Sequence, residues 1–249
     1  MPRIPLIENL IRGSLPTGCN LLVEFDPSSQ WYNAHVTIAA AWLKTGGKVM
    51  YHISAQPTDR VRVQLKRLGV PNIDNLENVG PTDSPTLALN DWYTAAIGRK
   101  EEDQFVEEHK VYNSLKVADL SIVWMEGERK YGDLYEKPGP PVLRIHDNIS
   151  CLSRFNDEKA WVEFVIRRII PRATRWNQVA LIGLTEGLHS DSVYKTLEGL
   201  ADGVIDFKLK ETPDEIKDLV RIRSMRSVGF DRAWHPLRMS ENTEITLEG

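Results

Sequence analysis

The stretch VEFDPSSQWYNAH, residues 23–35, lies where a phosphate-binding loop would do its chemistry. An apolar strand, CNLLVEF, leads into it, and an amphipathic helix, WYNAHVTIAAAWLKTGG, leaves it. A loop of the form G-x-x-x-x-G-K-[ST] curls backbone N–H groups around phosphate, while its lysine reaches the phosphate oxygens and its hydroxyl binds Mg²⁺. In this chain the turn between strand and helix has neither a glycine nor a lysine.

The loop residues replace each group that would hold a nucleotide. Aligned without a gap, Phe25 and Gln30 stand for the two glycines, and Trp31 stands for the lysine. Loss of the lysine removes about 1.5–3 kcal/mol of charge-assisted hydrogen bonding. Asp26 adds a negative charge, and glycine-only backbone would cost roughly 1–2 kcal/mol per residue, so we expect another loop shape. The eight aligned positions are Phe25, Asp26, Pro27, Ser28, Ser29, Gln30, Trp31 and Tyr32.

Two aromatic residues of this loop have two interpretations. Trp31 and Tyr32 could stack on a nucleic-acid base or an adenine ring, because each presents a flat apolar face. The simpler interpretation is that they fill the cleft that a nucleotide would otherwise occupy. We therefore expect the loop to serve the core of the protein.

Residues elsewhere offer fewer chemical possibilities. His146 directly precedes Asp147, but neighbours on a strand point to opposite faces, so we do not expect this pair to bind a metal. The segment GLHSDS follows a strand, where functional side chains gather in open α/β sheets. His189 and Asp191 are candidates there, although Ser190 or Asp191 as a helix cap is the simpler interpretation.

Arginines in the last third of the chain alternate with apolar residues. Arg221 and Arg223 alternate with Val220 and Ile222, which gives a strand with one polar and one apolar face. This pattern favours a solvated or subunit-facing surface over contact with DNA. No Ser/His/Asp triad and no metal-ligand cluster has convincing spacing, so we expect no catalytic residues and no metal.

Apolar runs of strand length alternate with helix-period segments, which is typical of a mostly parallel sheet covered by helices. The tail LVRIRSMRS, WHPLRMS and TEITLEG predicts short antiparallel strands at the sheet edge, and residues 126–141 predict a surface loop. The expected strands are residues 20–25, 48–54, 86–91, 141–147, 179–185 and 203–209. The expected helices are residues 30–45, 57–69, 101–117, 157–169 and 190–201.

Composition sets the broad class. The chain has 249 residues, of which 41% are hydrophobic and 27% charged, as in ordinary globular domains. Its formal charge of −4 gives no overall attraction to nucleic acid. Cys19 and Cys151 are expected to be core thiols in a reducing compartment. With no signal-peptide pattern and no long apolar stretch, we expect a cytoplasmic protein that contacts no membrane.

Several stretches together carry a resemblance. The opening LIRGSLPTGCNLLVEF turns into the first strand, and WLKTGGKVMYHISAQPTDRVRVQLKRLGV supplies the second strand and its helix. VLRIHDNISCL is a hydrophobic strand that ends in Asp147, and VRIRSMRSVGFDRAWHPLRMSENTEITLEG is the most specific stretch. Over roughly residues 10–249 the chain resembles the KaiC-like group of RecA-fold ATPases, particularly archaeal KaiC-like and RadA-paralogue-like proteins.

The resemblance implies a RecA-like P-loop NTPase fold. This is an α/β architecture with a mostly parallel central sheet flanked by helices and C-terminal antiparallel strands. It further implies a single KaiC/RecA-like domain over residues 1–249. Because RecA-fold sites lie between subunits, it also implies a homo-oligomer or assembly with a RecA/KaiC-like partner protein.

At several positions that the family uses for nucleotide hydrolysis, this chain has different residues. Ala55 and Gln56 stand where the family has the acidic pair that polarises the attacking water. The family's K-x-R on a late strand, which reaches a neighbour's phosphates, is here Ser-Met-Arg ending in Arg226. Asp147, the residue that would hold Mg²⁺ through water, is retained, and so is Arg226.

These departures predict a pseudo-ATPase that acts as a regulatory or scaffold subunit through protein–protein association, without a cofactor. The alternative is a weak nucleotide-binding ATPase that holds ATP and Mg²⁺ through Asp147 and a remodelled loop, with a role in signalling or DNA recombination and repair. Binding to single-stranded nucleic acid, as in RadA-like relatives, is a third hypothesis and is not favoured. Arg226 is expected to lie between subunits, where it could serve an active neighbour.

Overall fold

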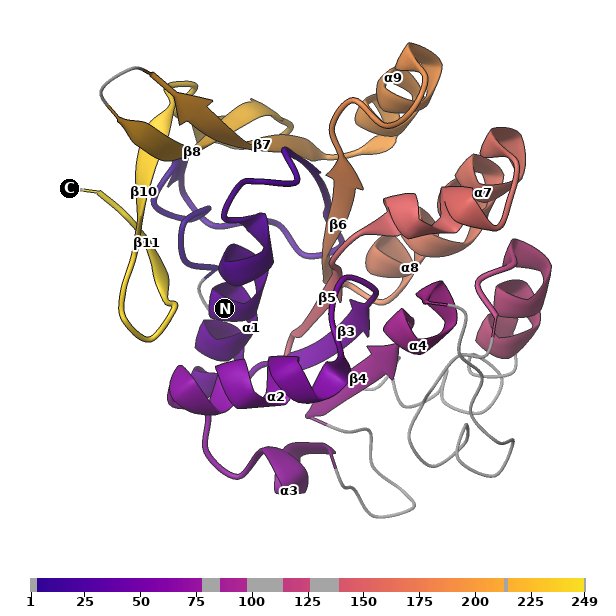
Figure 1. Ribbon diagram of the computed structural model, residues 1–249, viewed down its shortest axis with the longest axis horizontal. Coiled ribbons are helices and arrows are strands. Elements are labelled where there is room, and N and C mark those ends of the chain that lie inside the picture. The colour runs from indigo at the N-terminus through magenta and orange to yellow at the C-terminus, as the bar shows by residue number, and fades with distance from the viewer. Residues whose placement is uncertain (1–3, 78–85, 98–113, 126–138, 213–214, 249) are drawn as a thin grey trace.

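The computed structural model describes residues 4–77, 86–97, 114–125, 139–212 and 215–248 (Figure 1). Most of its strands join one nine-stranded sheet, and the remaining two form a small separate pair. The strands are β1 (Ile11–Arg12), β2 (Asn20–Phe25), β3 (Lys48–Ile53), β4 (Leu87–Asp91), β5 (Val142–His146), β6 (Val179–Thr185), β7 (Gly203–Glu211), β8 (Ile216–Met225), β9 (Gly229–Phe230), β10 (His235–Met239) and β11 (Ile245–Leu247).

Helices lie on both sides of the sheet (Figure 1). Residues 117–125 form a helix that carries no label in Figure 1. The helices are α1 (Trp31–Lys44), α2 (Thr58–Arg67), α3 (Ile73–Glu77), α4 (Tyr93–Ala96), the 3-10 helix η1 (Ile149–Arg154), α7 (Glu158–Phe164), the π-helical turn η2 (Val165–Ile169), α8 (Ile170–Arg175) and α9 (Asp191–Leu200).

The sheet has the order β11-β10-β8-β7-β2-β6-β5-β3-β4. From β7 to β4 all neighbouring strands are parallel, whereas β8, β10 and β11 add antiparallel strands at one end. Every residue of β2 and β6 is buried, because helices cover both faces of the parallel part. The predicted mostly parallel α/β sheet with a C-terminal antiparallel extension is confirmed.

Each face of the sheet has its own hydrophobic core. One core joins β2, β3 and β5 to α1, α2 and α3, and the other joins β6 to α4, α7, α8 and α9. In α1 the residues Trp31, Ala34, Ile38 and Trp42 all lie against the sheet with at most 1% exposure. Burial of each such large side chain contributes about 1.5–3 kcal/mol, which fixes α1 directly after the β2 turn.

Three predicted boundaries were wrong in ways that affect the site. The second predicted strand ends at Ile53 rather than residue 54, and the fourth ends at His146 rather than residue 147. Ser54 and Asp147 therefore follow their strands, where each can turn toward the other. The helix predicted over 157–169 continues through a π-helical turn to Arg175.

Two predicted segments fall largely outside the described residues. They are the loop at 126–141, of which the structure describes only 139–141, and the helix at 101–117. Residues 114–116 are not helical, and helix begins near Val117 instead. The backbone N–H of Val117 donates to the side chain of Asn156 at 2.9 Å, which caps the helix there.

None of the described helices combines the length and the apolar character needed to cross a membrane.

Cys19 and Cys151 are both free thiols, and Cys19 is buried beside the start of β2. Burial raises the pKa of the Cys19 thiol to about 12, so this thiol stays protonated and unreactive.

Candidate functional site

The loop after β2 is held by hydrogen bonds to an aspartate of the same loop, Asp26. Ser28 donates its backbone N–H to Asp26 Oδ1 at 2.8 Å. Ser29 directs its backbone N–H and its hydroxyl at the carbonyl oxygen of Asp26, at 2.9 and 2.6 Å. No residue from Phe25 to Tyr32 has a positive φ. Two backbone N–H donors that could otherwise face a phosphate are thus used within the loop, in an ordinary turn that requires no glycine.

Trp31 lies beneath this turn and is fully buried. Its indole Nε1–H donates to the carbonyl oxygen of Asp147 at 2.7 Å, and its ring packs 5.3 Å from Phe207. Gly183 on β6 provides the space, since a Cβ there would collide with the Asp147 carbonyl and crowd the indole. The side chain that replaces the lysine therefore links the first turn of α1 to the end of β5.

Asp147 is completely buried and is held by neutral donors. Its carboxylate accepts from the Ser54 backbone N–H at 2.9 Å, from the Ser54 hydroxyl at 2.6 Å and from the Ala55 N–H at 3.1 Å. Burial raises the pKa of Asp147 to about 6, and the hydrogen bonds from Ser54 and Ala55 oppose that rise. The retained carboxylate thus joins the ends of β3 and β5.

Side-chain amides form a connected row above the loop. Gln56 donates to Gln64 at 3.1 Å, Gln64 donates to Asn33 at 3.3 Å, and Asn33 donates to Gln30 at 2.8 Å. Gln30 in turn faces Asp218 on β8 with its backbone N–H and its side-chain amide. We call Gln56, Gln64, Asn33 and Gln30 the amide row. It begins at one of the positions where the resemblance implied an acid.

Two carboxylates lie near the start of α1. Burial raises the pKa of Asp218, Gln30 lowers it, and the negative charge of Asp26 raises it again. A helix N-terminus attracts anions, and here carboxylates of the same chain take that place. A phosphate group brought to this helix would meet Asp26 and Asp218 instead of the lysine that a phosphate-binding loop supplies.

The loop after β6 holds a second polar group. His189 Nε2 lies 2.8 Å from the Ser150 hydroxyl, which also accepts from the Thr185 backbone N–H at 2.9 Å. Burial lowers the pKa of His189, so it is neutral at pH 7. Glu158 accepts hydrogen bonds from Ser190 rather than completing a Ser–His–acid arrangement. Sequence reasoning identified His189 but missed Ser150, which lies 39 positions away.

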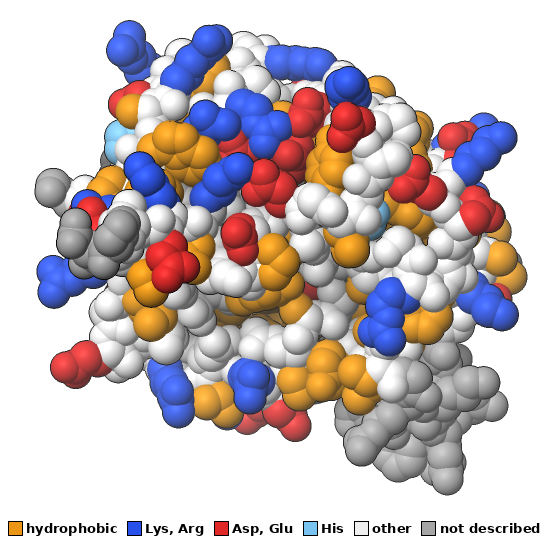
Figure 2. Space-filling model, turned by 45° about the horizontal axis from the view of Figure 1, so that its top comes forward, with side chains coloured by type: hydrophobic (Ala, Val, Ile, Leu, Met, Phe, Trp, Pro, Cys, Tyr) orange, Lys and Arg blue, Asp and Glu red, His pale blue; other side chains and the backbone are white. Residues whose placement is uncertain are grey.

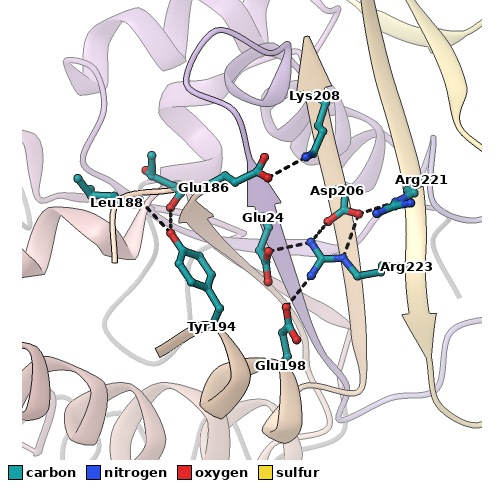
Figure 3. Close-up of polar contacts among 10 residues, drawn as sticks. Glu24, Glu186, Leu188, Tyr194, Glu198, Asp206, Lys208, Arg221 and Arg223 are labelled. Carbon is teal, nitrogen blue, oxygen red and sulfur yellow. Dashed lines mark hydrogen bonds and ion pairs between the residues drawn. The ribbon is translucent and has the colours of Figure 1, made fainter. Parts of the chain in front are cut away.

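Ser190 occupies the N-cap position of α9, yet its side chain makes no capping hydrogen bond. The prediction of a cap at Ser190 or Asp191 was therefore correct in its position, but the expected capping hydrogen bond from the Ser190 side chain is absent. Tyr194 holds the loop instead (Figure 3), because its hydroxyl donates to the Thr185 carbonyl at 2.6 Å and accepts from the Leu188 N–H at 3.0 Å.

Charged side chains on the β7 and β8 side of the sheet pair with one another (Figure 3). Arg223 contacts Asp206, Glu24 and Glu198, with the last two at 2.8 and 2.5 Å. Arg221 binds Asp206 at 2.6 Å. We call these five residues the arginine–carboxylate network.

Burial shapes the titration of this network. Asp206 is fully buried and Glu24 is 5% exposed. Burial raises the pKa of Glu24 to about 7, although Arg223 lowers it. The predicted solvated or subunit-facing surface for Arg221 and Arg223 holds only in part: their side chains are 32% exposed, but buried carboxylates bind both guanidinium groups. A subunit contact there stays a prediction. In Figure 2, blue and red side chains lie side by side below the upper rim of the face.

Arg226 lies away from the loop. Gly203 at the start of β7 pairs with Met225, so Arg226 follows at the amino-terminal edge of the parallel strands, opposite the β2 turn. Its Nη2 donates to the carbonyl of Gly199 at 2.7 Å, at the last turn of α9. Within this chain it therefore caps a helix C-terminus.

His146 faces away from Asp147, as the alternation of a strand predicts. Its ring stacks on His52 of β3 with centroids 4.3 Å apart, and burial holds the pKa of both imidazoles well below the ordinary value. Across the described residues, no group of three or more His, Cys, Asp or Glu side chains could hold a metal ion.

Comparison with solved structures identifies the fold, whereas the sequence comparisons found no match. No family model matches the sequence, and no curated protein matches it. A KaiC-like protein of the hyperthermophilic archaeon Pyrococcus horikoshii superposes with a TM-score of 0.70 at 15% identity, covering 100% of this chain and 97% of its own. The chain has the RecA-like fold of KaiC proteins.

Two further solved structures share this RecA-like fold. An uncharacterized Pyrococcus horikoshii protein, solved in complex with an unknown peptide, gives a TM-score of 0.68 at 16% identity over 95% of this chain and 94% of its own. The flagellar accessory protein FlaH of Methanocaldococcus jannaschii gives 0.66 at 18% identity over 100% and 99%. At such identities the likeness establishes the fold and leaves the activity to the residues of the site.

Proposed function

We propose that this RecA-like chain has lost ordinary ATP hydrolysis and acts as a regulatory or scaffold subunit through protein–protein association. The observation that carries this proposal is the position of Trp31. Its buried indole bonds to the Asp147 carbonyl in place of a phosphate-binding lysine. Moving it aside for a ligand would cost about 2–3 kcal/mol, a factor of roughly 100 in affinity.

The charges around the loop support the same proposal. Phosphate transfer requires cations at the phosphate oxygens and a base or positioning group for the attacking water. This chain places Asp26 and Asp218 near the start of α1. Gln56, at a position of the family's acidic pair, donates to Gln64. These residues supply neither the cations nor the base, which argues against ATP and Mg²⁺ as ligands of this site.

The fold supports association as the remaining role. One of its structural neighbours was solved in complex with an unknown peptide. We propose that this chain likewise associates with polypeptide, as a homo-oligomer or with a RecA/KaiC-like partner. In such an assembly Arg226, which is exposed at the amino-terminal edge, would exchange its contact with the Gly199 carbonyl for the partner.

Calorimetry with MgATP and MgADP tests the loss of nucleotide chemistry. We expect no saturable heat from the wild-type chain and no phosphate release above that of Asp147→Asn, the matched control for binding through the retained carboxylate. Light scattering across a concentration series would follow self-association in parallel.

Saturable heat with wild-type protein, lost in Asp147→Asn and accompanied by phosphate release, would replace the proposal with the weak ATPase. The role of Arg226 has its own test, which is the activity of a partner ATPase mixed with wild-type protein or Arg226→Ala. Equal activity in the two mixtures would remove Arg226 from the interface.

A further inference from the structure

The amide row joins four separate parts of the chain at the carboxyl-terminal edge of the sheet. Gln56 follows β3, Gln64 lies on α2, Asn33 lies on α1, and Gln30 precedes α1 next to Asp218 of β8. All four residues are partly exposed. Each therefore makes contacts within the protein and still presents part of its side chain to solvent.

Hydrogen-bonding capacity remains on the row. An amide group has two N–H donors and a carbonyl oxygen with two lone pairs. Gln56 uses one donor toward Gln64, and Gln64 uses one donor and accepts one bond. Asn33 gives its amide to Gln30 and to the sulfur of Met239. The row thus retains both donors and acceptors, which is the pattern that a polypeptide main chain matches.

Apolar side chains flank the row. Met239 contacts Asn33 and is 48% exposed. Ile216 lies two residues from Asp218 on β8, on the same strand face, and is 64% exposed. Such residues suit the apolar side chains of a bound segment, while neutral amides would meet its backbone.

The charges at the Gln30 end of the row select against other ligands there. None of the four amides is ionised, and the carboxylates at the Gln30 end of the row are Asp26 and Asp218. A phosphate-bearing ligand, whether nucleotide or nucleic acid, would be repelled there. A polypeptide carries no backbone charge, and a Lys or Arg side chain would pair with these carboxylates.

From these contacts we infer that the amide row, with Met239 and Ile216 beside it, binds an extended segment of a partner protein through that segment's main chain. This inference rests on the proposed function and specifies where association takes place. The bound segment would place apolar side chains on the flanking residues and a basic side chain near Asp218.

Selection from a displayed library of random dodecapeptides, followed by fluorescence polarisation with a selected peptide, tests the inference. We expect Asn33→Ala and Gln64→Ala to weaken binding about tenfold each, since each removes about one hydrogen bond and disrupts the row. Asn75→Ala on α3, an exposed amide outside the row, is the matched control and should bind as wild type. A peptide N-methylated along its main chain should lose binding.

A library that yields no binder, or a selected peptide that binds Asn33→Ala and Gln64→Ala as tightly as wild type, would overturn the inference. Thermal unfolding of each variant confirms that it is folded before binding is measured. The outcome is separable from the proposed function, because MgATP binding by wild-type protein would overturn that function whatever the peptide does.

Discussion

The β2 turn and the arginine–carboxylate network are two polar regions of one sheet that are held in opposite ways. At the turn, the buried carboxylate of Asp147 is surrounded by neutral donors from Ser54 and Ala55. In the network, the carboxylates of Asp206 and Glu24 meet the full positive charge of Arg223. Both arrangements bind buried carboxylates, but only the second uses cations.

The difference shows where this chain retains positive charge. A nucleotide site on this fold needs a cation at the β2 turn, and there the chain has Trp31 and the amide row. The guanidinium groups of Arg221 and Arg223 lie on β8, where carboxylates of the same chain neutralise them. Charge in this part of the molecule therefore stabilises the fold, and Lys208, which lies beside the β2 turn, is likewise paired with Glu186 of the same chain.

The largest expected effect comes from removing the cation that the network shares. Arg223→Met leaves Asp206 and Glu24 buried with less compensation, and loss of one partner of a buried ion pair costs about 3–5 kcal/mol. Because the Arg223 side chain is 32% exposed and Arg221 still binds Asp206, we expect about 3 kcal/mol. Urea unfolding measures the change in the free energy of unfolding.

Lys217→Met is the matched control, since Lys217 pairs with Glu215 on the surface. Exposed pairs contribute at most about 1 kcal/mol, so this variant should unfold almost as wild type does. Equal loss of stability in Arg223→Met and Lys217→Met would mean that the network is no more than a surface feature.

A smaller effect is expected at the turn. Trp31→Phe keeps an aromatic ring but removes the N–H that bonds to the Asp147 carbonyl. An unpaired buried carbonyl and a partly filled space together should lower the free energy of unfolding by about 2 kcal/mol. MgATP calorimetry on the variant should still show no binding, since the acidic groups remain. A gain of nucleotide affinity would mean that Trp31 alone excludes the ligand.

The smallest effect is a change in pH dependence. Burial raises the pKa of a carboxylate in both regions, but to about 7 for Glu24 and only to about 6 for Asp147, so the network titrates at higher pH. Glu24 has a folded pKa of about 7, above its ordinary value of 4.5, so the native state binds the extra proton between these values. Its contribution to stability is therefore fully present below about pH 4.5 and is lost as pH rises through about 7. Glu24→Gln should reduce this loss between pH 5 and 8, as followed by urea unfolding at each pH. An unchanged profile would place the Glu24 pKa near its ordinary value.

The fold was largely predictable from sequence because its signals are local. Runs such as NLLVEF and VALIGLT are apolar throughout, which only a strand covered on both faces requires. The same local logic placed Trp31 in the core and Asp147 at a strand end. Where the signal was not local, as at Val117, whose cap comes from Asn156, the boundary was missed.

The polar chemistry was predictable only in part, because its partners are far apart in sequence. Glu24 meets Arg223 across 199 positions, and Ser54 meets Asp147 across 93. A lone glutamate in an apolar strand gives no sign of which cation it will bind. The amide row could not be inferred for the same reason, since its members gain meaning only once β3, α1 and α2 are folded together.

Tyr194 has a consequence for the motion of the loop after β6. Its hydroxyl accepts the backbone N–H groups of Leu188 and His189 while donating to the Thr185 carbonyl. Leu188 is 58% exposed and would ordinarily exchange its amide hydrogen freely. Tied in this way, the amides of Leu188 and His189 should exchange slowly, and only when α9 shifts away from β6. The loop after β6 should therefore open only together with α9, although it lies on the surface.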